Sequence, residues 1–133
     1  MKYLGDGFAV HNITYKGDKN LLLTFHGCGA GTTTGSAYSK LESFGRVLDD
    51  IDVIAVGHSH KLGVNISADR LKLNDTRLKQ KIQYHCTCGS FLGNYDDGVA
   101  SYAERKGYMP LPMGYVKVVI DRGEITEVKA IPV

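Results

Sequence analysis

Three histidines in two short segments are the residues of this sequence whose types and spacing could do chemistry. His58 and His60 end an apolar run that begins at Ile54 and turns at Gly57. A bent backbone lets two histidines one residue apart reach the same small volume, and a glycine permits that bend without a Cβ against a ligand. Imidazole is the commonest metal-binding side chain and is largely neutral near pH 7. The Gly-His-x-His turn therefore indicates a metal site, with two surface histidines as the alternative interpretation.

The same local plan occurs upstream, where the apolar run 21–25 ends in His26-Gly27. Ligand sites in layered sheets gather at the carboxyl ends of neighbouring strands. Taken alone, His26 would be interpreted as a structural histidine. Its position matches that of His58 and His60, so we predict that all three imidazoles line one metal site.

A glycine-rich loop follows the first histidine. Gly27, Cys28 and Gly29 are candidates for a substrate-facing loop, because successive backbone N–H groups can hold a phosphate. The Walker pattern fails, since Gly35 is followed by Ser36 with no lysine. A flexible connection into the next helix is the alternative.

The elements that must position these residues are mostly strands. A helix is expected over 36–49, and Ser39 and Glu42 have the spacing of a capping box if this helix starts late. Strands outnumber this helix, so the sequence predicts an α+β fold with a layered β-sheet/helix architecture. We expect strands at 8–15, 21–25, 52–56, 64–68, 70–73 and 83–88, and a hairpin of 115–121 with 125–131.

Together these features resemble the calcineurin-like metallophosphoesterase family. That family carries Asp-x-His, Gly-Asp, Gly-Asn-His-Asp/Glu, a lone His and Gly-His-x-His, in that order. Phe25-His26-Gly27 matches the lone His, and 57–60 matches the last motif. Segments 88–92 and 101–108 are similar to the tail of phage-type members. The resemblance covers nearly the whole chain, but only the second half of the family's domain.

The resemblance implies a fold and an activity. Residues 1–133 would form one domain, the C-terminal portion of the family's four-layer sandwich. The activity would be that of a hydrolase, a metal-dependent phosphatase acting on phosphate esters, with nucleic acid only as a possible substrate. His26 and His58 would bind one metal and His60 the other. Manganese, iron and zinc all accept imidazole ligands.

Two of the family's motifs are missing. The sequence has neither Asp-x-His nor Gly-Asn-His-Asp/Glu, and Gly5-Asp6 and Gly17-Asp18 are interpreted as turns. Autonomous activity is therefore in question, and a missing N-terminal half or a second copy of the chain could complete the site. The alternative is a non-catalytic, metal-binding remnant, or an accessory domain that associates with itself.

Composition narrows the class of protein further. The chain has 133 residues, a net charge of +2 and no apolar run long enough to span a membrane, so we expect no membrane partner and no nucleic-acid wrapping surface. Three cysteines argue against a disulfide framework and for a cytoplasmic setting. His85-Cys86-Thr87-Cys88 offers a competing zinc site, although buried small side chains are the simpler interpretation.

Overall fold

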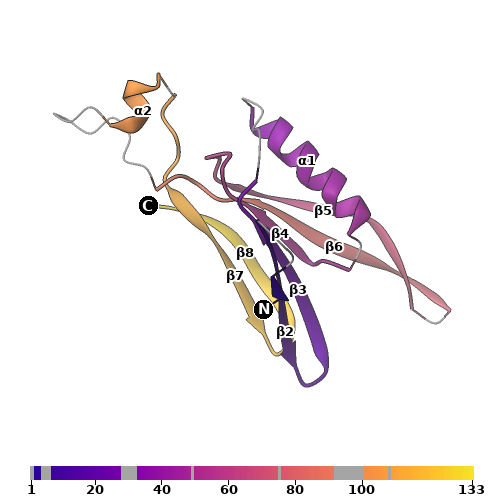
Figure 1. Ribbon diagram of the computed structural model, residues 1–133. Coiled ribbons are helices and arrows are strands. Elements are labelled where there is room, and N and C mark those ends of the chain that lie inside the picture. The colour runs from indigo at the N-terminus through magenta and orange to yellow at the C-terminus, as the bar shows by residue number, and fades with distance from the viewer. Residues whose placement is uncertain are drawn as a thin grey trace.

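A computed structural model describes residues 2–3, 7–27, 33–48, 50–74, 76–91, 101–107 and 109–133. Strands dominate it, as Figure 1 shows. The elements are β1 (Lys2–Tyr3), β2 (Phe8–Tyr15), β3 (Asp18–Phe25), α1 (Thr34–Val47), β4 (Val53–Val56), β5 (Gly63–Asn74), β6 (Arg77–Thr87), α2 (Tyr102–Arg105), β7 (Gly114–Asp121) and β8 (Glu124–Pro132).

Six strands form a mixed sheet in the order β1-β2-β3-β4-β6-β5, and β7 and β8 form a separate hairpin. The strands β3, β4 and β6 run parallel, whereas β2 and β5 are antiparallel to their neighbours. The helix α1 makes the crossover between β3 and β4 that parallel strands require. The same end of three strands therefore lies along one edge of the sheet.

The centre of this sheet is the short strand β4. Its residues Val53 and Ile54 are almost fully buried, and Val56 is buried as well. A parallel strand covered on both faces is expected to be a continuous apolar run rather than an alternating one, and 53–56 fits that rule.

The helix α1 covers one face of the sheet. Its N-cap is Thr33, whose side-chain oxygen accepts the backbone N–H of Ser36 at 3.3 Å. Ser39 and Glu42 would form a capping box only in a helix that started late; α1 begins before either residue, so they do not cap it. The buried core beneath this helix consists of Leu23, Leu41, Ile51, Ile54 and Val56.

The hairpin of β7 and β8 lies on the other side of the sheet (Figure 1). Strand register separates the two faces: Leu23, Ile54 and His85 share the helix side, while Leu22, Val53 and Tyr84 form the next row. At the hairpin tip, the Asn20 side-chain amide donates a 2.7 Å hydrogen bond to the Gly123 carbonyl. This bond ties the hairpin to β3.

The predicted fold class is confirmed, since the molecule is a layered arrangement of sheet and helix. The largest differences from the expected elements concern β5 and β6. Segments 64–68 and 70–73 form one strand with an irregularity between Ser67 and Arg70, and β6 begins at Arg77 rather than at residue 83. The first half of β6 is polar, so its pairing with β5 rather than an apolar pattern makes it a strand. In the described ranges, neither helix has the length and apolar character needed to cross a bilayer.

Candidate metal centre

The three parallel strands end level with one another. Phe25, Val56 and Thr87 occupy one row of the register, and each strand stops there. The segments that follow are His26-Gly27 after β3, 57–60 after β4, and Cys88 after β6. A level carboxyl edge brings the residues that follow each strand into one neighbourhood.

His26 and His58 meet at this edge. The Nε2 of His26 lies 3.0 Å from the Nδ1 of His58, and the ring centroids are 4.9 Å apart in an edge-on arrangement. Both side chains are exposed. Two nitrogens that come from different strand ends, 32 residues apart in sequence, are therefore at hydrogen-bond distance from each other on exposed side chains.

The backbone at this edge is unusual, and it sets the directions of the rings. His58 and His60 have φ values of 56° and 52°, in the left-handed region that few residues other than glycine adopt. Across His58, the Ser59 N–H donates to the Gly57 carbonyl over 2.5 Å, closing a three-residue turn. Such conformations cost energy and concentrate at functional sites.

Gly27 is required beside the histidine pair. Its φ is +89°, and a Cβ there would lie 2.7 Å from the Cγ2 of Val56. A side chain at this position would therefore push β3 away from β4. The glycine keeps His26 close to the turn that carries His58.

His60 is the third imidazole of the group. Its ring centroid lies 6.4 Å from that of His58. Its Nδ1 is buried and has no hydrogen-bond partner within the described structure. Burial lowers the pKa of His60, and the nearby charges of His58 and His26 lower it further. A neutral imidazole with a free nitrogen is the form that binds a metal.

The arrangement can be tested against the geometry that a shared cation needs. Nitrogens bound to one Zn²⁺ at about 2.0–2.1 Å in a tetrahedral site lie about 3.3 Å apart. The 3.0 Å between His26 and His58 is close to that separation. Over the described ranges, however, no three His, Cys, Asp or Glu side chains are gathered around a single point. The geometry thus fits two imidazole ligands, His26 and His58, for one ion. His60 lies next to them but does not complete a three-ligand group.

The competing zinc site is not formed. His85 lies on the helix side of β6, where its Nε2 is 2.8 Å from the Oε1 of Gln83, while the register places Cys86 on the opposite face. Cys86 is fully buried and free. The interpretation of Cys86 as a buried small side chain fits this geometry.

The remaining candidate residues lie in three different places. Cys28 and Gly29 of the proposed substrate loop lie outside the described residues. His11 lies apart from these histidines on the sheet, with its Nε2 2.8 Å from the Oγ1 of Thr24. A buried polar row on β6, formed by Gln83, His85 and Thr87, was missed, although its spacing of two residues was a visible signal.

The fold and this edge define a class: a layered α+β protein with a histidine pair where its parallel strands end. No family model matches the chain, and the search of curated proteins found no match. Among solved structures, it is similar to wild-type Vps29 of Entamoeba histolytica complexed with Zn²⁺, at 19% identity and a TM-score of 0.43. The match covers 100% of this chain and 62% of the Vps29 chain, so this chain spans less than two thirds of the length of Vps29.

Proposed function

We propose that this chain carries the histidine half of a calcineurin-like metallophosphoesterase site, in which His26, His58 and His60 hold divalent metal for phosphate-ester hydrolysis. The observation that carries the proposal is the 3.0 Å approach of His26 Nε2 to His58 Nδ1. Without metal, this distance is that of a hydrogen bond between the two rings, whereas a shared cation would use the lone pair of each nitrogen.

The roles of the residues follow from their positions. His26 and His58 would bind the first ion through the facing nitrogens, and His60 would offer its unpartnered Nδ1 to a second. Gly27 lets the segment that carries His26 pass close to Val56 and to the turn of His58, because it has no side chain. When bound, the metal would supply Lewis acidity and an activated water. Manganese, iron and zinc all suit imidazole ligands.

The chain lacks the carboxylate ligands of a complete two-metal site. Asp-x-His and Gly-Asn-His-Asp/Glu are absent from the sequence. A separate N-terminal half, or a second copy of the chain, would have to contribute them. The free thiols of Cys86 and Cys88 support the further proposal that the protein works in a reducing, cytoplasmic compartment.

A second candidate function is metal binding without hydrolysis. It is favoured by one observation: no carboxylate joins the histidines to make a three-ligand group in the described structure. Imidazole ligands alone can hold zinc while leaving a water position open. An accessory or self-associating domain would have these properties.

One pair of measurements separates the two functions. The purified chain is loaded with Mn²⁺ or Zn²⁺, its metal content is measured by elemental analysis, and turnover of an aryl phosphate ester is followed. His26→Ala should lower both metal content and any turnover. The matched control is His11→Ala, which removes an imidazole that lies on the sheet and bonds to Thr24.

The outcomes are distinct. Metal and turnover that both depend on His26 support the phosphoesterase. Metal that depends on His26 without any turnover supports the non-catalytic domain. Equal metal content in wild type, His26→Ala and His11→Ala contradicts both functions.

A further inference from the structure

The opposite end of the parallel strands is open, unlike the level carboxyl edge. β4 begins only at Val53, whereas β3 begins at Asp18 and β6 at Arg77. β3 pairs with β4 only from Leu22 onward, and β6 pairs with β4 only from Tyr84 onward. Residues 18–21 and 77–83 are thus two strand segments that flank a notch where the middle strand is missing.

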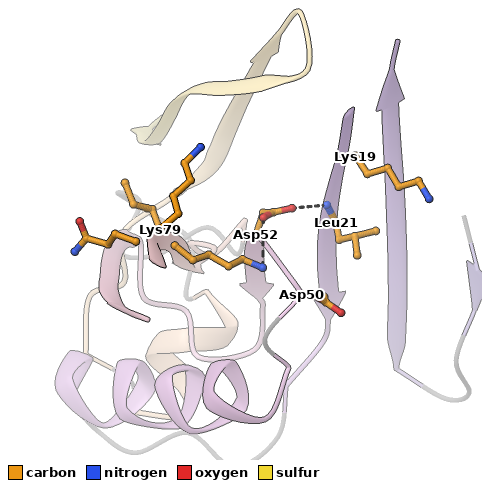
Figure 2. A pocket seen from close by; sticks show the side chains of 8 residues that line it. Lys19, Leu21, Asp50, Asp52 and Lys79 are labelled. Carbon is orange, nitrogen blue, oxygen red and sulfur yellow. Dashed lines mark hydrogen bonds and ion pairs between the residues drawn. The ribbon is translucent and has the colours of Figure 1, made fainter. Parts of the chain in front are cut away.

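A pocket of about 680 Å³ occupies this notch. It is lined by Lys19, Leu21, Asp50, Asp52, Lys79, Gln80, Lys81 and Ile82. Figure 2 shows Lys19 and Lys79 on the two sides of Asp52, so residues from β3 and from β6 form opposite walls.

The backbone of both walls is available for pairing. Phe25 on β3 and Tyr84 on β6 use their backbone groups toward β4, and alternate residues of a strand point the same way. The N–H and C=O groups of Lys19, and those of Gln80 and Ile82, therefore point into the notch. In the described sheet, no strand pairs with them there.

The top of the notch shows how such groups are satisfied. The Asp52 carboxylate accepts the Leu21 N–H at 2.8 Å, and the Asp52 N–H donates to the Leu21 carbonyl at 2.8 Å (Figure 2 shows the first bond). Asp52 thereby ends the ladder with its own side chain. Below it, nothing in the described residues takes over this role.

The charge of the notch selects its ligand. Asp52 is engaged by Leu21 and by Lys81, whose Nζ lies 3.8 Å away. The other charged residues that line the pocket are two lysines, Lys19 and Lys79, and one carboxylate, that of Asp50.

From these observations we propose that the notch binds an extended, acidic segment of a partner protein, which adds a short strand between β3 and β6. Main-chain hydrogen bonds to Lys19, Gln80 and Ile82 would hold its backbone, and Lys19 and Lys79 would pair with its acidic side chains. Residues 18–21 set its length at about four residues, or about 13 Å of strand. This site is independent of the proposed phosphoesterase function.

A direct test uses a fluorescein-labelled hexapeptide of alternating Glu and Val, with fluorescence anisotropy as the measurement. We expect saturable binding with Kd below about 1 mM. The same peptide with N-methyl groups on alternate backbone amides should bind about three- to tenfold more weakly, because it loses ladder hydrogen bonds but keeps its charge. A Lys-Val peptide should not bind.

Variants of the protein locate the site. The double variant Lys19→Glu/Lys79→Glu should weaken binding by at least about tenfold, while Lys106→Glu/Lys129→Glu makes the same charge change on other exposed lysines and should leave binding unchanged. Gln80→Pro removes an N–H that points into the notch, and Gln80→Ala keeps it, so only the proline variant should weaken binding. His26→Ala should bind the peptide as wild type does.

Three results would overturn the proposal. They are the absence of saturable peptide binding, equal binding of the N-methylated peptide, and tighter binding of a labelled oligothymidylate that the Lys19/Lys79 double variant loses. The last result would assign the notch to nucleic acid. Because the peptide arm uses unaltered protein, a variant that fails to fold does not prevent a decision.

Discussion

The two ends of the β3–β4–β6 triplet differ in a way that explains what each can bind. At the carboxyl end, three strands stop in one row, and the loops after them carry His26 and His58 to within 3.0 Å of each other. At the amino end, β4 starts late, so its neighbours extend past it and leave unpaired backbone between lysines. Level strand ends gather side chains, whereas uneven strand ends leave main-chain edges open.

The largest expected effect comes from truncating a core residue of β4, the strand that both ends share. Ile54 is fully buried at the centre of β4, so Ile54→Ala should lower the free energy of unfolding by about 2–5 kcal/mol. Urea unfolding followed by circular dichroism measures the loss. Ile66→Ala is the control, since Ile66 is 59% exposed on β5 and its loss should change stability by no more than about 0.5 kcal/mol. Equal losses in the two variants would mean that β4 is not the structural centre.

The second prediction tests whether the two ends of the strand triplet bind their ligands independently. Zinc at 100 times its Kd should stabilise the wild-type protein by about 2.7 kcal/mol, because only the folded chain brings the histidines together. Thermal unfolding with and without zinc measures this effect. His58→Ala should lose the stabilisation, and Lys79→Glu should keep it. If Lys79→Glu abolished the zinc effect as well, the two ends would not act independently.

The third change alters the level edge without touching a histidine. Gly27→Ala places a Cβ at a φ of +89° and 2.7 Å from Val56, which should cost about 1–3 kcal/mol. It should also weaken zinc binding by moving His26. The matched control is Gly35→Ala in α1, where an added Cβ meets nothing within 4 Å. That variant should gain about 0.5–1 kcal/mol of stability, and a loss there would contradict the helix assignment.

The smallest expected effect concerns the face covered by the hairpin. Burial, and to a smaller extent the neighbouring Cys88, raise the pKa of Cys86 to about 12 from an ordinary value near 9. The folded state therefore holds the proton more tightly than the unfolded state. The resulting stabilisation is complete below pH 9 and is lost progressively as pH rises from 9 toward 12.

We expect this difference to remove about 1 kcal/mol of stability between pH 8 and pH 10. Urea unfolding at the two pH values, compared with Cys86→Ala, isolates the contribution of this thiol. An identical pH dependence in wild type and Cys86→Ala would show that the thiol is not buried beneath the hairpin.

The sequence was sufficient for the central strands and for the histidine pair. Apolar runs that end in His26 and His58 identified strand ends, and glycines beside them identified the turns. It was not sufficient for the first half of β6, because 77–83 is polar and is a strand only through its pairing with β5. The notch could not be predicted either, since it depends on where three strands start relative to one another.

Local signals also competed with each other. Ser39 and Glu42 have capping-box spacing but lie inside α1, whereas Thr33 forms the actual cap. A reciprocal pair at the other helix was overlooked: the Glu104 carboxylate accepts the Ser101 N–H at 2.7 Å, and the Ser101 hydroxyl accepts the Glu104 N–H at 3.3 Å. Spacing alone does not say which of several candidate caps begins a helix.

The crossover between β3 and β4 has a kinetic consequence. His26 and His58 are 32 residues apart, and between them the chain must form α1 and return alongside β3. Contacts across such a connection form late, after the entropy of closing the loop has been overcome. In a refolding experiment, the cation would be supplied bound to a metal-sensitive dye. Its transfer from the dye to His26 and His58 would then mark the time at which the crossover closes.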